Sequence, residues 1–482
     1  MTRLLVYLLF LAACVVAIGC VVEPTNQPNK NATGASSPSP AASPSPSSEN
    51  EKASNAQPLT LPVLDAFFAD EAFSGLLKTR LQLTDEQVTQ LKGLARAETA
   101  KLNEVNAGKA EGGTTAARTA AEEKISSVIG EPKTQQLAAL VRERWSAAND
   151  NGSEKTATES TSPNTPEVFA ASAPNGVPTD SRVLVNAPAY RMDVFENGEL
   201  LKSYKIGIGY PQFPLPTGLR KARTIVFNPT WTPPDEPWVA KMKDIKVGEK
   251  VEAGSKLNPL GPIKIPIGGP SLIHGGKSPA KLGTFASHGC VGLTTPQVQD
   301  FAKLLAQLAG SRLTDSDLAD YARDKTQTKQ VKLSKAVPVE LRYETIVVED
   351  GQLHIYRDVY DQDTNTEENL RAVLEANGAR LEDLTEQERA QVLDALAQMS
   401  GKSGAAVVTP PALSRQSPLS SASPNSNSPA ERKTSATRRT LRAVKNQKEI
   451  VIEIAALKGK GYPAPVNLDT GSGRTTAGRL KR

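Results

Sequence analysis

The stretch SLIHGG at residues 271–276 and the stretch ASHGCVGL at residues 286–293 hold most of the reactive side chains of this sequence. The chain of 482 residues has three Cys and three His, and Cys290 lies 16 positions after His274 and two after His288. A nucleophilic Cys needs a base or a cation that favours its thiolate, and backbone N–H groups that receive an oxyanion. The pattern therefore predicts a cysteine nucleophile, and Gly289 permits a tight turn that exposes the thiol and those amides.

Two other interpretations of Cys290 compete with this one. One Cys and two nearby His supply three of the about four ligands that zinc needs, although His-Gly-Cys is not a usual zinc spacing. Alternatively, Cys290 is an inert residue buried in a strand. The surrounding sequence argues against both.

The residues before this stretch alternate between apolar and polar from residue 181, which is typical of strands. Strands are expected at 183–185, 192–195 and 204–209, with a type I′ turn at Asn197-Gly198. Short strands with Pro and Gly between them continue to about residue 291, a pattern that favours a β-sandwich or barrel. A helix is expected over 295–309, and two β-runs, 337–348 and 353–359, are joined by a second turn at Asp350-Gly351.

Residues 181–310 resemble the catalytic domain of the L,D-transpeptidases of the YkuD or ErfK/YbiS type. The resemblance rests on His274-Gly275 followed, after eleven intervening residues, by Ser287-His288-Gly289-Cys290-Val291. Further matching phrases occur in the family's order: Asn197-Gly198, Pro216-Thr217-Gly218, Asn228-Pro229-Thr230-Trp231 with Pro233-Pro234, and Asn258-Pro259-Leu260-Gly261. The resemblance implies an L,D-transpeptidase-type, mainly β catalytic domain, which spans 181–363 if the two later β-runs close it.

The resemblance also implies a role for each matching residue. Cys290 is the nucleophile, and His274 is the general base that activates it and later the acid. The Gly275 carbonyl holds the His274 imidazole in the working tautomer.

The same resemblance assigns supporting roles around the nucleophile. The amides of Gly289 and Cys290 form the oxyanion hole, while Ser287 and His288 shape the pocket. Many family members carry Arg or Asn two residues after the Cys, where this chain has Gly292. If that side chain helps to hold a substrate carboxylate, either another basic group does so here or the affinity is lower. The third histidine, His354, lies in an expected strand and is interpreted as a packing residue.

The implied reaction is acyl transfer in peptidoglycan biosynthesis, and hence in cell wall organisation and cell shape. The nucleophile forms a thioester with a stem tetrapeptide and releases D-Ala, and an amine of a neighbouring stem resolves the thioester into a 3→3 cross-link. No metal or organic cofactor is needed. Water as the acceptor would give a carboxypeptidase or endopeptidase, and a protein amine would attach that protein to the wall. An inactive, wall-binding structural lipoprotein is the alternative from another class.

The N-terminal residues have the pattern of an export signal. A basic start precedes an apolar run of 19 residues, Leu4 to Val22, and both Cys14 and Cys20 follow small residues as in a bacterial lipobox. We expect residues 1–19 to be a signal peptide and Cys20 (or Cys14) to carry lipid, so that the protein is exported to the periplasm or cell envelope and anchored in a membrane. An uncleaved signal anchor with incidental cysteines is the alternative.

The rest of the chain divides by composition. With aromatic residues at 5% and 35 Pro, the chain cannot be folded throughout, and it has neither a collagen repeat nor enough Cys for a disulfide scaffold. We expect a Ser/Pro-rich tether (20–58), a helical module (59–148) with a capping box at Thr84–Gln87, a linker (149–180), a helical extension (364–400), and a low-complexity segment with a basic tail (401–482). The tether and the linker are expected to be disordered.

The basic charge of the protein is concentrated in its tail. Residues 431–482 carry a net charge of +9, whereas the rest of the chain carries −4. A solvated, disordered tail is the favoured interpretation, and contact with an anionic polymer or lipid surface is the alternative. The tail holds one strand-like stretch, Glu449–Ile454. Nucleic acid is not an expected partner of an exported protein.

Overall fold

The computed structural model describes residues 59–102, 113–147, 169–233, 239, 242–400, 447–471 and 475–476, which all belong to one compact unit, residues 49–482. The expected signal peptide and tether, with Cys14 and Cys20, lie outside the described residues, as do residues 401–446. In the described part of the chain, no helix is both long enough and apolar enough to cross a membrane.

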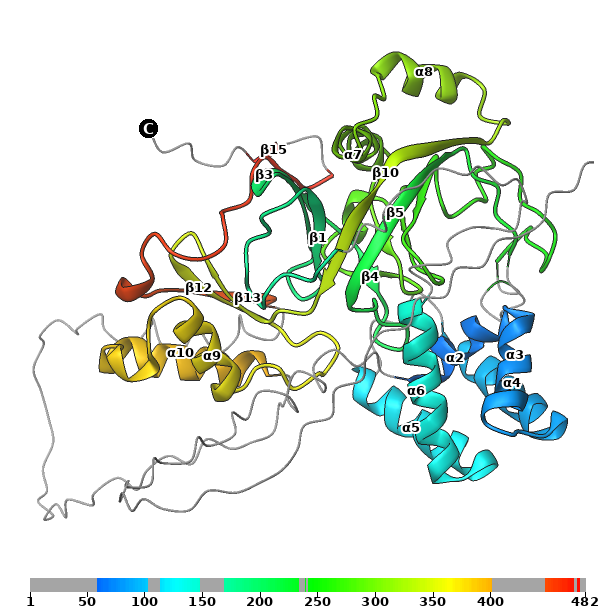
Figure 1. Ribbon diagram of the computed structural model, residues 1–482, viewed down its shortest axis with the longest axis horizontal. Coiled ribbons are helices and arrows are strands. Elements are labelled where there is room, and N and C mark those ends of the chain that lie inside the picture. Colours follow the sequence, from blue (N-terminus) through cyan, green and yellow to red (C-terminus); the bar gives the residue numbers. More distant parts are fainter. Residues whose placement is uncertain are drawn as a thin grey trace, which may run out of the picture. The chain divides into compact units, whose positions relative to one another are not determined.

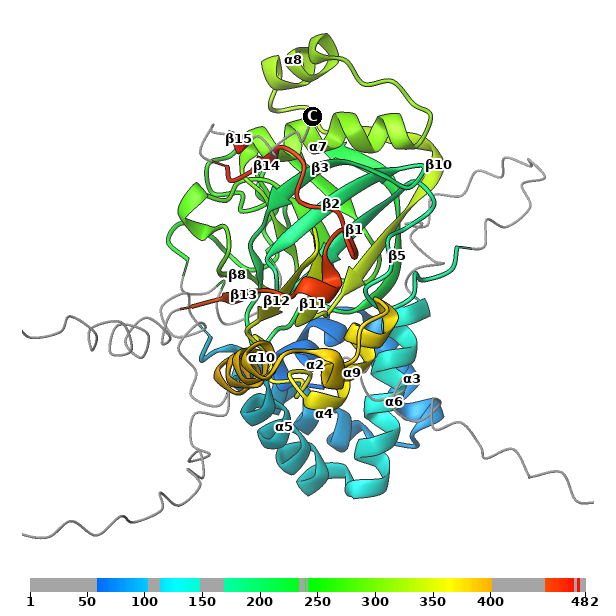
Figure 2. The ribbon, with the colours of Figure 1, turned by 90° about the vertical axis from the view of Figure 1, so that its left-hand side faces the viewer.

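A mixed sheet of ten strands, counted over the described residues, forms the centre of the expected catalytic region, in the order β15-β14-β3-β2-β1-β10-β5-β6-β7-β9. Its strands are β1 (Arg182–Asn186), β2 (Arg191–Glu196), β3 (Glu199–Lys205), β5 (Gly218–Phe227), β6 (Ile263–Pro266), β7 (Leu272–His274), β9 (Val291–Gly292), β10 (Lys329–Arg342), β14 (Leu468–Asp469) and β15 (Thr475–Thr476). A parallel pair, β4 (Ile208–Gly209) and β8 (Phe285–Ser287), accompanies it. The sheet curls around its core (Figure 2), which confirms the mainly β fold class.

The period of two in the sequence sorts side chains between the two faces of this sheet. In β1, Val183 and Val185 enter the main core, whereas Leu184 enters a smaller cluster on the opposite face. The expected turn at Asn197-Gly198 joins β2 to β3, with φ of 52° and 85°, and is therefore confirmed.

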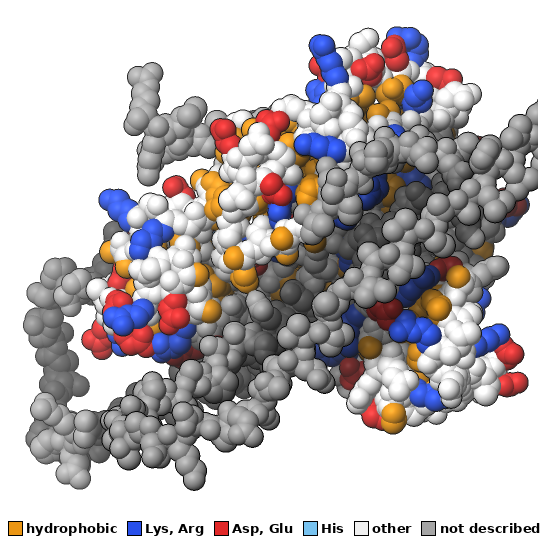
Figure 3. Space-filling model, in the orientation of Figure 1, with side chains coloured by type: hydrophobic (Ala, Val, Ile, Leu, Met, Phe, Trp, Pro, Cys, Tyr) orange, Lys and Arg blue, Asp and Glu red, His pale blue; other side chains and the backbone are white. Residues whose placement is uncertain are grey.

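Two helices follow the strand β9. Helix α7 (Thr295–Leu308) begins with a capping box and buries Phe301 and Leu305 in the main core, and it lies across the sheet in Figure 2. Helix α8 (Asp315–Arg323) buries none of its residues. Acidic and basic side chains are interspersed over it in Figure 3, as expected for a solvated helix.

The expected helical module contains five described helices with a core of their own (Figure 1). They are α2 (Leu61–Phe68), α3 (Glu71–Arg80), α4 (Asp85–Thr99), α5 (Gly113–Ile129) and α6 (Glu131–Ala147). The capping box at Thr84 and Gln87 is present. Gly130, with φ of 78°, separates α5 from α6, and Pro132 lies in the first turn of α6, where a missing N–H costs nothing.

The late β-run expected at 337–348 divides between two sheets. Its residues 337–342 belong to β10, which lies between β1 and β5 in the ten-stranded sheet. Residues 346–348, like residues 353–356 of the other late run, belong to a second sheet. Strands β11 (Ile346–Glu349), β12 (Gln352–Tyr356) and β13 (Glu449–Glu453) form it, and helices α9 (Glu367–Ala376) and α10 (Glu386–Met399) cover it. The expected boundary between a catalytic domain ending at 363 and an extension at 364–400 therefore runs through one continuous core. Local alternation predicted the strands but could not say which sheet they join.

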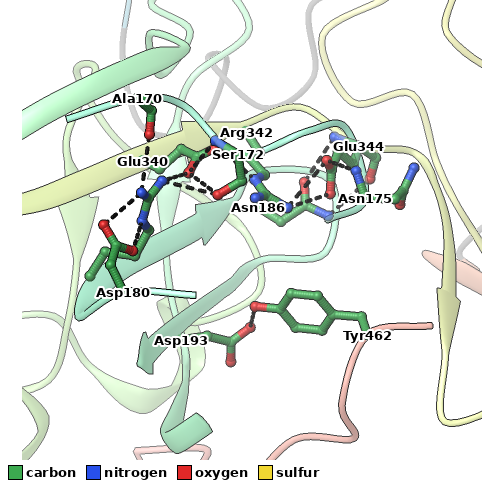
Figure 4. Close-up of polar contacts among 11 residues, drawn as sticks. Ala170, Ser172, Asn175, Asp180, Asn186, Asp193, Glu340, Arg342, Glu344 and Tyr462 are labelled. Carbon is green, nitrogen blue, oxygen red and sulfur yellow. Dashed lines mark hydrogen bonds and ion pairs between the residues drawn. The ribbon is translucent and has the colours of Figure 1, made fainter. Parts of the chain in front are cut away.

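The expectation of a disordered tail is wrong for residues 447–471. Strand β13 pairs with β12, and Leu457 is fully buried in the second core. Tyr462 is also buried, donates to Asp193 Oδ2 at 3.0 Å and stacks edge-on against Phe195 (Figure 4). These apolar residues lie between the basic ones, and their burial outweighs the repulsion among tail charges.

The last twelve residues of the expected linker also pack against the sheet (Figure 4). The buried Arg182 and Glu340 form an ion pair on neighbouring strands and need further partners. The Ala170 carbonyl accepts from Arg182 at 3.0 Å, and the Ser172 hydroxyl donates to Glu340 at 3.0 Å. The backbone N–H of Asn175 donates to Glu344 at 2.6 Å, so residues 169–180 are part of the folded body.

Truncating Leu457 should destabilise the second sheet. Leu457→Ala removes a fully buried side chain, so we expect a loss of about 2–5 kcal/mol in the stability of this sheet. Hydrogen exchange of the β12 amides measures it directly. Val451→Ala is the matched control, because Val451 lies in the same tail and is 45% exposed. Equal exchange rates in the two variants would contradict the packing described here.

Candidate active site

The pairing of β7 with β9 brings together the two segments that carry the predicted base and nucleophile. The two strands run parallel, with Ile273 opposite Val291 and His274 opposite Gly292. His274 is the last residue of β7, and Cys290 directly precedes β9. The two predicted residues therefore lie at neighbouring positions of adjacent strands.

The His274 imidazole is buried and has a defined tautomer. Its Nδ1 donates to the Gly275 carbonyl at 2.8 Å, as predicted, so that Nε2 carries the lone pair. Burial lowers the pKa of His274 to about 3, with help from the Lys277 ammonium and against the backbone hydrogen bonds of Gly275 and Leu260. The imidazole is thus neutral and able to accept a proton at neutral pH.

The turn from Ser287 to Cys290 is closed by the serine side chain. Ser287 Oγ donates to the Cys290 carbonyl at 2.5 Å and accepts from the Cys290 N–H at 3.1 Å. Gly289 has φ of 74°, and a Cβ there would lie 2.8 Å from the Phe213 ring. The buried Ser271 hydroxyl donates to the Gly289 carbonyl at 2.9 Å, which fastens the turn to the residue before β7.

The Cys290 thiol is half-buried in this turn. Its Sγ lies 3.8 Å from the His288 carbonyl and 3.9 Å from the Pro270 carbonyl. Burial raises the pKa of the Cys290 thiol, while the Leu272 N–H and the Lys277 ammonium act in the opposite direction. The resting pair is therefore a neutral thiol beside a neutral imidazole, which requires proton transfer during attack.

His288 faces a different environment from His274. Its ring packs edge-on against Tyr210 and Phe213, with centroids 5.2 and 6.1 Å away. Burial, with a contribution from Lys277, lowers the pKa of His288 to about 4. This arrangement is consistent with a residue that shapes the pocket.

A glycine contact fixes the loop that carries His274. Gly261, in the Asn-Pro-Leu-Gly turn, has φ of 65°, and a Cβ there would lie 2.6 Å from the Gly276 nitrogen and 2.8 Å from the Gly275 carbonyl carbon. Two motifs that are 14 residues apart in the sequence are thus in backbone contact. Asn258 holds the turn by accepting from the Leu260 N–H at 3.0 Å.

Comparison with known families decides the identity of this segment. Residues 180–331 match the YkuD family model, which describes the L,D-transpeptidase catalytic domain. Residues 180–331 are an L,D-transpeptidase catalytic domain. A comparison with curated proteins finds no match.

Several solved structures of L,D-transpeptidases are similar to this chain. The catalytic domain of the Enterococcus faecium enzyme is 16% identical, and the match covers 35% of this chain and 100% of that one, with a TM-score of 0.23. The Mycobacterium smegmatis enzyme is 16% identical over 34% of this chain and 58% of that one, at a TM-score of 0.21. An enzyme of Mycobacterium tuberculosis is 14% identical over 34% and 57%, at 0.19.

The L,D-transpeptidase domain contacts the helical module through the loop that packs on His288. Phe213 belongs to the core of the helical module. Thr60 donates to the Gln212 carbonyl at 2.6 Å, and Thr114 donates to the Pro211 carbonyl at 2.8 Å. Tyr360 holds the ends of this loop, because its hydroxyl donates to the Gly209 carbonyl at 2.9 Å and accepts from the Leu215 N–H at 3.1 Å.

Other candidate groups lie elsewhere. His354 is on β12 in the second sheet, where its Nδ1 lies 2.6 Å from Glu449, in agreement with a packing role. Among the residues that the structure describes, no three His, Cys, Asp or Glu side chains gather so as to hold a metal ion.

Sequence reasoning did not single out Lys277, Ser271, Tyr210 or Phe213 around the L,D-transpeptidase site. Ser271 and Lys277 directly flank the residues 272–276, so their closeness in sequence was a signal that could have been used. Phe213 offered no such signal, because its role depends on a contact with helices that all end at least 66 residues before it in the chain.

Proposed function

We propose that this protein is a peptidoglycan L,D-transpeptidase that makes 3→3 cross-links through a Cys290 thioester. The observation that carries the proposal is the pairing of β7, which ends at His274, with β9, which Cys290 directly precedes, within a domain of this family. The Nδ1–H bond to Gly275 leaves His274 Nε2 able to accept the thiol proton.

The proposed reaction proceeds in two balanced steps. Cys290 Sγ attacks the carbonyl that joins the third residue of a stem tetrapeptide to its terminal D-Ala, and the thiol proton passes to His274. The tetrahedral intermediate collapses as His274 returns that proton to the departing D-Ala amine, which leaves a thioester. An acceptor amine then attacks the thioester, its proton passes to His274, and the released thiolate recovers it.

Backbone amides at the turn supply the stabilisation of the oxyanion in this proposal. The amides of Gly289 and Cys290 are the donors that we assign, with Ser287 and His288 shaping the pocket around them. In the resting site the Cys290 N–H donates to Ser287 at 3.1 Å, so in this proposal it exchanges that hydroxyl for the oxyanion as the tetrahedral intermediate forms.

The acceptor distinguishes the alternatives. Water would make the protein a carboxypeptidase or endopeptidase, and the amine of a protein would attach that protein to the wall. An amine on a neighbouring stem is our choice because the family is named for transfer. The inactive wall-binding lipoprotein is disfavoured by the intact pair of His274 and Cys290.

We propose that this chemistry takes place outside the cytoplasm, in the periplasm or cell envelope. Residues 1–19 would direct export, and lipid on Cys20 (or Cys14) would anchor the protein in a membrane. Contact of the tail with an anionic polymer remains part of this proposal for the basic residues outside 447–471. Within that segment, Lys448 and Lys460 already donate to the Gly283 and Gly378 carbonyls.

Product analysis tests the proposed function. The full-length protein incubated with disaccharide-tetrapeptide is expected to release D-Ala and form a 3→3 dimer, both followed by mass spectrometry. Disaccharide-tripeptide is the matched control, because without a terminal D-Ala it cannot donate. If the tetrapeptide substrate is converted to tripeptide but no dimer forms, the protein is a hydrolase instead. If folded protein neither releases D-Ala nor forms an adduct with a carbapenem, the enzyme proposal is wrong.

A further inference from the structure

The Lys277 side chain occupies the space beside Gly292 where another residue would carry a side chain. The Lys277 N–H donates to the Leu293 carbonyl at 3.0 Å, which fixes its backbone next to β9. A Cβ built on Gly292 would lie 2.9 Å from Lys277 Cγ, 3.0 Å from Cε and 3.4 Å from Cδ. The lysine stem therefore runs directly over Gly292, and it fits there because glycine has no side chain.

This path brings a positive charge to the reacting groups. Gly292 is the strand partner of His274 and follows Cys290 by two positions. The charge of Lys277 lowers the pKa of His274, of His288 and of the Cys290 thiol. The ammonium of a half-buried side chain thus lies close to all three.

We propose that Lys277 binds a carboxylate of the donor stem peptide beside the bond that Cys290 attacks, and that Gly292 provides the room for it. This inference rests on the proposed function and names a specificity determinant of the same site. A fixed, partly desolvated ammonium beside neutral groups favours an anionic ligand over a neutral one.

Two carboxylates of a stem tetrapeptide lie near the scissile bond. One is the C-terminal carboxylate of D-Ala, and the other is a free carboxylate on the diamino acid at the third position. Their chemistry is the same, so substrates that are amidated at one position or the other distinguish them.

Lys277→Gln tests the proposal through substrate discrimination. With the unmodified tetrapeptide, we expect kcat/KM to fall about 10- to 100-fold, mainly through KM, because a charged hydrogen bond is lost. With the substrate in which the contacted carboxylate is replaced by a carboxamide, the kcat/KM of the native protein should fall by a similar factor. Lys277→Gln should not lower kcat/KM for that substrate any further. Lys277→Arg should retain most of the discrimination, and Lys256→Gln, at an exposed lysine, should behave as the native protein.

An equal effect of Lys277→Gln on all substrates would contradict the proposal. If Lys277→Gln lowers kcat/KM equally for the free and for both amidated substrates, Lys277 acts only on the thiol and the proposal is wrong. The pH dependence of alkylation by iodoacetamide, a neutral reagent, measures that effect on the thiol separately.

A binding measurement keeps the inference independent of turnover. Calorimetry of the tetrapeptide on Cys290→Ala, and on Cys290→Ala combined with Lys277→Gln, should show about 10-fold weaker binding in the second. Binding without this difference would overturn the role of Lys277 even if the protein turns over substrate. If the difference in affinity is found but the protein does not turn over the substrate, the proposed function is wrong and the site only binds a carboxylate.

A compensating pair makes the spatial argument testable. Lys277→Ala frees the volume above Gly292, whose backbone does not require a glycine because its φ is not positive. Adding Gly292→Arg to Lys277→Ala should therefore recover about tenfold in kcat/KM for the free substrate and nothing for the amidated one. Recovery on both substrates, or on neither, would contradict the assignment.

Discussion

Cys290→Ala is expected to abolish the formation of a covalent adduct with a carbapenem and to lower tetrapeptide turnover by on the order of 10⁴- to 10⁶-fold. The thiol is the only group of the turn that can form the thioester, and the neighbouring serine cannot replace it. Ser287 Oγ is committed to closing the turn through the Cys290 N–H and carbonyl. Intact mass and D-Ala release measure both effects.

The adduct measurement needs a control for the rest of the chain. Cys14 and Cys20 are also present in the sequence, so labelling that persists in Cys290→Ala would identify one of them as its site. The fold should survive this substitution, because Cys290 is half-buried and alanine is smaller. Unchanged turnover by folded Cys290→Ala would refute the thioester mechanism.

His274→Gln is expected to lower the acylation rate at pH 7 by about 10²- to 10⁴-fold. In the native protein the imidazole is neutral above its pKa of about 3, and burial holds the thiol pKa above its ordinary value. Between these two limits the neutral pair is the dominant form, so the native rate should vary little with pH. Below about pH 4 protonation of His274 removes the base and the rate falls.

The variant should show a different pH profile as well as a lower rate. Without the base, only thiolate that has already ionised can react, so acylation by His274→Gln should rise about tenfold per pH unit up to the thiol pKa. A merely structural loss would scale the native profile without changing its shape. His354→Gln is the matched control, because this histidine lies in the second sheet against Glu449. A flat profile for His274→Gln would exclude the role of general base.

The residues of the candidate site were predictable because they are close in sequence. His274 and Gly275 lie at the end of β7, and the turn from Ser287 to Cys290 directly precedes its neighbour β9, so the spacing of the motif follows from that arrangement. Lys277 was not singled out, because its role depends on the absence of a side chain at Gly292, on the strand that pairs with β7. The absence of a side chain gives no pattern in a single sequence.

The strands were also predictable, but their partners were not. The apolar run at 337–348 was predicted as one strand, yet it divides between β10 and β11, and the sheet that each joins depends on edges far away in the chain. Strand β13 shows the same limit, since the stretch at 449–454 was predicted as a strand but its partner β12 was not. Ile452 becomes buried because β12 offers it a free edge and α10 covers it.

The pairing of β13 with β12 has a consequence for how cleavage of this protein would be observed. About fifty residues separate α10 from β13 in the chain, yet the two elements share one core. A protease that cuts once between residues 401 and 446 would produce two polypeptides that remain associated, because the pairing of β12 with β13 and their shared core join the two fragments. Size exclusion would report an intact molecule, whereas a denaturing gel would report two fragments. The C-terminal fragment would then behave as a tightly bound peptide ligand of the remaining body.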